Sequence, residues 1–108
     1  MSYQHEDLDI ALTLEEFYQD CLLNGFTKRT VGCYHSSLKI WQEFLAQRGI
    51  SELTDITRDN LLEYGHYLQT TYRCRKGNPL SISTIAQKLA ALRSFLSFCV
   101  CVGKLLNE

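Results

Sequence analysis

Side chains suited to base edges and phosphates gather on one side of a predicted helix near the C-terminus. At about 100° per residue, Thr84, Gln87, Lys88, Ala91 and Ser94 share a side that is small and polar, with one cation and no carboxylate. Exposed helix faces ordinarily mix glutamate with lysine. Threonine, glutamine and lysine can hydrogen-bond to base edges and phosphates, and the free amides of a helix N-terminus favour a phosphate near Thr84. The chemistry that this side offers is binding of nucleic acid.

Further cations stand at the start of an earlier predicted helix and in a predicted loop. Lys28 and Arg29 flank a helix cap, and Lys39 follows three turns later. Cations at a helix N-terminus oppose the helix dipole and add little stability, so a phosphate partner would explain them; simple solvation explains them equally well. Arg75 and Lys76 belong to a basic stretch before the single proline of the chain, which indicates a loop.

Catalysis by this chain alone is not expected. The histidines at 5, 35 and 66 have no H-E-x-x-H spacing, and the G-x-S-x-G and G-x-x-x-x-G-K-[ST] motifs are absent. The five cysteines form no C-x-x-C pair. Cys99 and Cys101 point about 200° apart on a helix and cannot share a metal. We therefore expect no catalytic residue, no metal site and no cofactor.

Composition indicates one globular domain with segregated charge. The 108 residues carry 11 Lys and Arg against 12 Asp and Glu, and a net charge of −1 by itself disfavours a nucleic-acid partner. However, residues 1–23 hold acids and no base, whereas residues 64–107 hold bases and no acid. The acidic N-terminus does not resemble a signal peptide, and the longest apolar run, residues 98–102, is too short to span a bilayer. We expect a cytoplasmic protein without a membrane segment.

Capping and stop signals predict an all-α bundle. Thr13 opens a T-L-E-E capping box for a first helix, so residues 1–12 are expected to be an N-terminal extension and residues 13–107 the bundle. Thr27 begins a second helix that stops at Gly49, and Thr57 caps a third. A fourth helix runs from about Ser83 to Val102 and stops at Gly103.

The periodicity of apolar residues predicts which faces are buried. Tyr34 and Trp41 lie on the apolar stripe of the second helix, so they are expected in the core rather than stacked on bases. The buried face predicted for the fourth helix consists of Ile85, Leu89, Leu92, Leu96 and Cys99. The polar side opposite either contacts nucleic acid or packs on another protein, and the pattern alone leaves both open. Affinity that falls steeply with salt would indicate nucleic acid.

Three stretches resemble the core-binding domain of tyrosine recombinases and phage integrases. The run from Gly25 to Thr30, followed by Tyr34, Leu38, Trp41 and Phe44, resembles the family's G-x-[ST]-x-x-T-x-x-x-Y-x-x-x-L-x-x-F opening. Residues 53–57, Leu-Thr-Asp-Ile-Thr, resemble the entry to its third helix. Residues 83–95, which include Ser83, Thr84, Leu92 and Phe95, resemble its s-x-x-T-x-x-x-x-l-s-a-l-r-s-F helix. The resemblance covers roughly residues 13–107.

The resemblance implies a SAM-like orthogonal bundle of four or five helices. In that family the second and fourth helices face the major groove, as one half of a clamp around the recombination site. Carried over by position, the contacts to DNA would come from Lys28, Arg29, Lys39, Thr84, Gln87 and Lys88, with Arg75 and Lys76 on the backbone. The family's catalytic Arg, Lys, H-x-x-R and Tyr set lies in a separate C-terminal domain, which is absent from this chain. The implied partners are double-stranded DNA, that catalytic domain and other recombinase subunits. The alternative is a helical protein-interaction module that binds no DNA.

Overall fold

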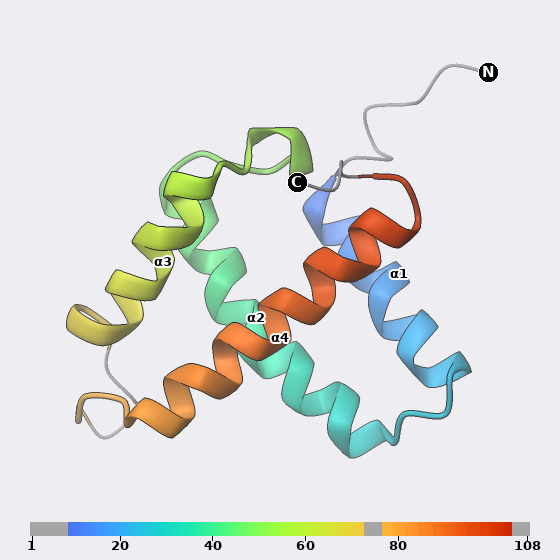
Figure 1. The fold of residues 1–108 in the computed structure, drawn as a ribbon, viewed down its shortest axis with the longest axis horizontal. Coiled ribbons are helices and arrows are strands. Elements are labelled where there is room, and N and C mark those ends of the chain that lie inside the picture. Colours follow the sequence, from blue (N-terminus) through green and yellow to red (C-terminus); the bar gives the residue numbers. More distant parts are fainter. Residues whose placement is uncertain (1–8, 73–76, 105–108) are drawn as a thin grey trace.

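Four α-helices and one short 3-10 helix make up the described chain (Figure 1). The computed structural model describes residues 9–72 and 77–104. The helices are α1 (Ile10–Leu23), α2 (Lys28–Gln47), η2 (Leu53–Asp55), α3 (Arg58–Thr70) and α4 (Ile82–Cys101). An isolated β-bridge pairs Asp9 with Glu52. The predicted all-α bundle is confirmed.

Local side-chain caps start α2, α3 and α4. Thr27 accepts the backbone N–H of Thr30 at 3.2 Å, as predicted for the start of α2. At α3 the predicted cap Thr57 forms a full capping box, in which the Asn60 side-chain oxygen accepts a hydrogen bond from the Thr57 backbone N–H at 3.0 Å. Helix α4 is capped by Ser81, two residues before the predicted start. Each cap pairs an amide that the first helical turn leaves without a partner.

The predicted start of α1 is wrong. Thr13 lies inside the helix, and its hydroxyl donates to the Asp9 carbonyl at 2.8 Å instead of capping. The cap is Asp9, whose carboxylate accepts the amides of Ala11 at 2.8 Å and Leu12 at 3.3 Å. The Ile10 side chain is buried and its N–H donates to the Ser51 carbonyl at 3.0 Å. Residues 10–12, expected in an extension, therefore form the first turn of the bundle.

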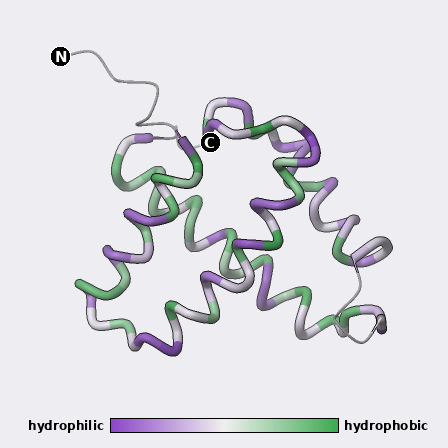
Figure 2. Tube along the Cα trace, turned by 180° about the vertical axis from the view of Figure 1, so that it is seen from behind, coloured by the Kyte–Doolittle hydropathy of each residue, from purple (hydrophilic) through white to green (hydrophobic). Residues whose placement is uncertain are grey.

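Helices α2 and α4 cross near their middles and form the centre of the fold. In Figure 1, α1 lies on one side of this crossing and α3 on the other, and α2 and α4 pack most extensively against each other. The side chains of Leu38 and Trp41 on α2 and Phe95 on α4 are almost completely buried there. Trp41 meets Phe95 edge to face with ring centroids 5.7 Å apart. Trp41 thus lies in the core, as predicted. Figure 2 shows hydrophobic and hydrophilic residues alternating along the helices.

Helix α4 is long and apolar enough to cross a membrane by length and composition alone. Its most apolar 18-residue window has a mean hydropathy of 1.2. Core helices of soluble bundles also reach such values, and Leu92, Phe95 and Cys99 of α4 are buried against the other helices. The hydropathy of this helix is therefore weak grounds for a membrane segment.

A buried hydroxyl in the core yields the first testable prediction. Tyr64 is fully buried on α3, and its hydroxyl has no hydrogen-bond partner among the described residues. Burial, followed by the nearby Tyr67 and Tyr72, raises the pKa of Tyr64 and keeps the phenol protonated. Because an unpaired buried polar group costs about 1–3 kcal/mol, Tyr64→Phe is expected to raise the free energy of unfolding by about 1 kcal/mol. Urea denaturation measures this difference.

The matched control is Tyr67→Phe, since Tyr67 is half-buried on the same helix and packs against the same Phe44 ring. It is expected to change stability by less than about 0.5 kcal/mol. A loss of stability in Tyr64→Phe that the control does not share would contradict the prediction, because it would mean that the Tyr64 hydroxyl is paired.

Candidate nucleic-acid interface

Three predicted cations lie exposed along α2. Lys28 and Arg29 occupy the first turn of the helix, directly after the Thr27 cap, and Lys39 follows three turns later. None of the three makes an ion pair with another described residue. The first turn contains no acidic residue to neutralise them. The N-terminal end of α2 therefore presents two free cations together with the positive end of the helix dipole.

The predicted polar side of α4 is not the exposed side. Ala91 is buried, with 2% of its surface exposed, and Ser94 is half-buried. Of the predicted buried face, Leu92 and Cys99 are buried, whereas Ile85, Leu89 and Leu96 are only half-buried. Phe95 is fully buried. At about 100° per residue, the buried side is turned by roughly 65° from the predicted one.

This rotation of α4 about its axis, relative to the predicted orientation, changes the surroundings of two predicted site residues. Thr84 is half-buried, and its amide and hydroxyl both contact the Ser81 hydroxyl, at 3.2 and 3.0 Å, as part of the helix cap. Lys88 is half-buried, and desolvation lowers the pKa of its ammonium group. Gln87, in contrast, is exposed. Of the three, Gln87 has the side chain most accessible to a partner.

Apart from Ile82 at the first position, the exposed positions of α4 form one surface, which we call the α4 outer face and whose members recur every three or four residues. It consists of Ser83, Ala86, Gln87, Ala90, Arg93, Ser97 and Cys101. Five of these side chains are small, and Gln87 and Arg93 lie at the two edges of the arc, about 120° apart. The sequence did not identify Arg93 as a site residue, because the predicted wheel placed it on neither face. Its exposure and its lack of an ion pair with a described residue are the signals that reveal it.

The two helices that carry these residues start at the same edge of the molecule. Figure 1 shows the N-terminal ends of both α2 and α4 at the lower edge and their C-terminal ends at the upper edge. Residues 28–42 and 77–104 contain no acidic residue, whereas α1, η2 and α3 carry six of the nine acids of the described residues. Charge is thus separated in space as well as in sequence. The acid-free stretch of α2, which ends before Glu43, and the whole of α4 direct two positive dipole ends to one edge.

The remaining candidates give a mixed outcome. Arg75 and Lys76 lie outside the described residues. Tyr34 is half-buried and stacks on Phe17 with ring centroids 5.7 Å apart, which favours a packing role.

The two cysteines near the end of α4 point apart, as predicted, because Cys99 is buried and Cys101 is exposed. Burial raises the pKa of Cys99 to about 12. Within residues 9–72 and 77–104 no three metal-ligating side chains gather.

Comparison with known proteins gave one match. The model of the family described as phage integrase, N-terminal SAM-like domain, is similar to residues 14–101 of the chain. This range includes α2, α3 and α4 in full and all of α1 after its first turn. No curated protein matches the chain, and no solved structure matches it.

Proposed function

The chain belongs to the phage integrase N-terminal SAM-like domain family, and on that basis we propose that it is the DNA-binding domain of a tyrosine recombinase. The SAM-like domain of this family is non-catalytic, so bond breakage and rejoining belong to a separate catalytic domain of the parent protein. In this proposal the domain clamps the recombination site by placing α2 and α4 in the major groove. It acts in the cytoplasm, as part of the full-length protein that integrates or recombines DNA.

The separation of charge carries the proposal. Residues 28–42 of α2 and the whole of α4 hold the exposed cations Lys28, Arg29, Lys39 and Arg93 and no acid. DNA binding draws most of its affinity from neutralising phosphates, and an acid on the contact surface would oppose it. An average domain surface mixes both signs, so two long acid-free helical stretches that begin at one edge support a polyanionic partner.

The residues divide into two roles in this proposal. Lys28, Arg29 and Lys39 contact phosphates and set the position of the domain on the duplex. Gln87 contacts base edges from the α4 outer face, where the small Ala86 and Ala90 allow α4 to approach the groove floor. Arg93 adds a phosphate or guanine contact at the other edge of that face.

The half-buried side chains have secondary roles in the proposal. Lys88 contributes long-range charge, and Thr84 contributes the phosphate-binding amides of the α4 cap. Arg75 and Lys76 contact the DNA backbone. The further partners are the catalytic domain and other recombinase subunits on the same DNA.

Titration of the ¹⁵N-labelled domain with a random-sequence duplex tests the proposal. Amide shifts are expected at residues 27–39 and 81–93 at low salt, and they are expected to vanish as salt rises, because the released counterions oppose binding. Shifts that persist at high salt on the α4 outer face would instead favour the protein-interaction module. A lack of shifts in both ranges at low salt would overturn DNA binding by this domain.

A further inference from the structure

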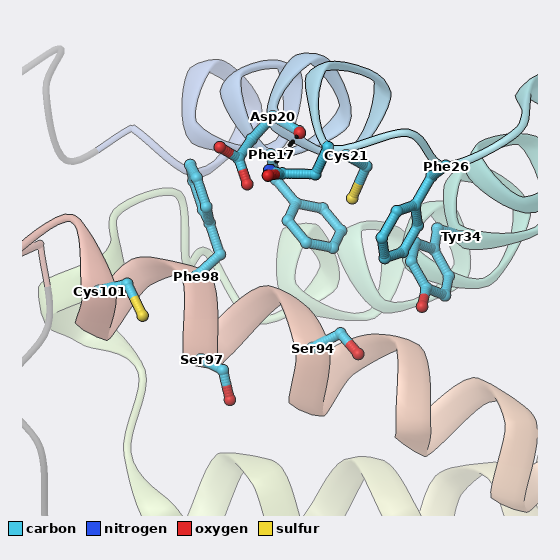
Figure 3. Close-up of a pocket in the computed structure, with 10 residues that line it drawn as sticks. Phe17, Asp20, Cys21, Phe26, Tyr34, Ser94, Ser97, Phe98 and Cys101 are labelled. Atoms are coloured by element: carbon cyan, nitrogen blue, oxygen red, sulfur yellow. Dashed lines mark hydrogen bonds between the residues drawn. The ribbon is translucent and has the colours of Figure 1, made fainter.

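An apolar hollow lies between α1 and the C-terminal half of α4, apart from the proposed phosphate contacts. It has a volume of about 370 Å³. Figure 3 shows Phe17 and Cys21 of α1 on one wall, Phe98 of α4 opposite, and Phe26 with Tyr34 at one end. Four of its ten lining residues are aromatic, and aromatic side chains are typical of pockets that receive an apolar side chain.

A second, shallower hollow of about 600 Å³ adjoins the first and shares Asp20 and Phe98 with it. Its apolar rim is formed by Leu23 and Val102, whose surfaces are 86% and 47% exposed. We call the two hollows together the α1–α4 groove. The two adjoining hollows lie along α1 and α4, so one polypeptide segment can occupy both at once.

The rim of the α1–α4 groove is negatively charged. The carboxylates of Glu15 and Asp20 make no ion pair with a described residue. Lys104 is the one cation among the described residues that line the groove, and Glu16 already holds it at 2.8 Å. Asp20 also lies in the last turn of α1, which contains no base, and a negative charge there opposes the helix dipole. The negative charge of Asp20 is thus unfavourable where it stands, and it lies beside an apolar hollow. A ligand that carries a positive charge next to an apolar group would complement both features.

Among the described residues, a second copy of this fold does not supply such a group. Away from the groove, the exposed large apolar side chains of these residues are Leu12, Leu22, Leu62 and Ile82. The first two lie on α1, which carries acids and no base. Leu62 has two acids, Asp59 and Glu63, within one helical turn, against one base, Arg58. Ile82 has no charged residue within four positions on either side. None of the four presents an apolar side chain in a net positive setting.

We propose that the α1–α4 groove binds a positively charged segment of another protein, which inserts an apolar side chain beside Phe98 and places a lysine or arginine against Asp20. The apolar anchor displaces water from the aromatic hollow, and the cation neutralises the carboxylate at the end of α1. The groove shares Ser97 and Cys101 with the α4 outer face, but it contains none of the side chains proposed to contact DNA. This docking therefore goes beyond DNA binding and does not depend on it.

The test uses a synthetic amphipathic peptide of leucine and lysine, about 14 residues long, and its counterpart with glutamate in place of lysine. The leucine–lysine peptide is expected to shift the amides of residues 17–26 and 97–102 in the ¹⁵N-labelled domain, and the leucine–glutamate peptide is not. Asp20→Asn is expected to weaken the peptide about threefold, because the ion pair is exposed. Leu23→Ser is expected to weaken it by a similar factor through lost apolar contact.

Matched controls change the same residue types outside the groove. Asp55→Asn removes an exposed carboxylate beyond α2, and Leu62→Ser removes an exposed leucine from α3, and both are expected to leave peptide affinity unchanged. Equal loss in the controls, equal binding of both peptides, or shifts elsewhere would overturn the proposal. So would concentration-dependent shifts in the groove without peptide, since these would make a second copy the occupant. Leu23→Ser is expected to bind duplex DNA normally, so failure of this proposal and failure of DNA binding are separate results.

Discussion

Replacing Lys28, Arg29 and Arg93 together by glutamate is expected to lower the affinity of the domain for a DNA duplex by about a hundredfold at low salt. All three side chains are exposed and make no ion pair with a described residue, so each is free to neutralise a phosphate. Loss of three phosphate contacts is also expected to reduce the slope of log affinity against log salt by about three. Fluorescence anisotropy of a labelled duplex at several salt concentrations measures both quantities.

The fold is expected to survive these substitutions. Lys28 and Arg29 stand in the first turn of α2, where glutamate interacts favourably with the helix dipole, so the melting temperature is expected to hold or rise. Arg93→Glu alone is matched by Arg58→Glu, which alters net charge equally at an exposed cation of α3. If both single variants lose the same affinity, the net charge of the domain controls binding, and the assignment of Arg93 to the interface is wrong.

The helix starts that the sequence predicted correctly depend on neighbouring residues. Thr27 and Thr57 each accept a hydrogen bond from a backbone amide three residues later. Each of these helix caps can therefore be recognised from four consecutive residues of the sequence. The resemblance to integrases rests on the same regions, since it includes the Thr27 cap and the apolar stripe of α2. Local capping and periodicity were therefore sufficient to predict an all-α bundle. The family was predicted from the resemblance of these motifs to those of integrases, and the family match confirms it.

The errors occurred where distant residues decide the structure. Helix α1 begins one turn early because the Ile10 N–H pairs with the Ser51 carbonyl at 3.0 Å and Asp9 bridges to Glu52, some forty residues away. Asp9, which caps the helix, is a preferred N-cap residue, so the sequence offered two local caps. The T-L-E-E motif made Thr13 look the better one. The contacts with residues 51 and 52, which select Asp9, cannot be read from the residues around Thr13.

The orientation of α4 has a similar cause. Leucine, alanine, phenylalanine and cysteine surround most of its circumference, so several directions are almost equally apolar. Packing against α1, α2 and α3 selects among them. It turns Phe95 into the core, and small Ala91 is buried on the same side. Arg93 is thereby exposed, and this is why the candidate site gained a cation that the helical wheel had not assigned to it.

Ala91→Lys is expected to destabilise the domain by at least about 3 kcal/mol, a large part of the 5–15 kcal/mol that stabilises a typical domain. With 2% of its surface exposed, the alanine leaves no room for a longer side chain. A lysine here either buries its ammonium without a partner or forces the neighbouring helices apart, and both are costly. Thermal unfolding followed by circular dichroism measures the loss.

Ala90→Lys provides the control, because Ala90 precedes Ala91 directly and lies on the α4 outer face. Both variants have the same composition, charge and helix propensity, so any difference between them reports the orientation of α4. Ala90→Lys is expected to change stability by less than about 0.5 kcal/mol. If Ala91→Lys is tolerated as well as Ala90→Lys, then α4 presents Ala91 outward, as the sequence predicted. The base-contacting role would then move from the Gln87 and Arg93 edges to the side formed by Thr84, Lys88 and Ser94.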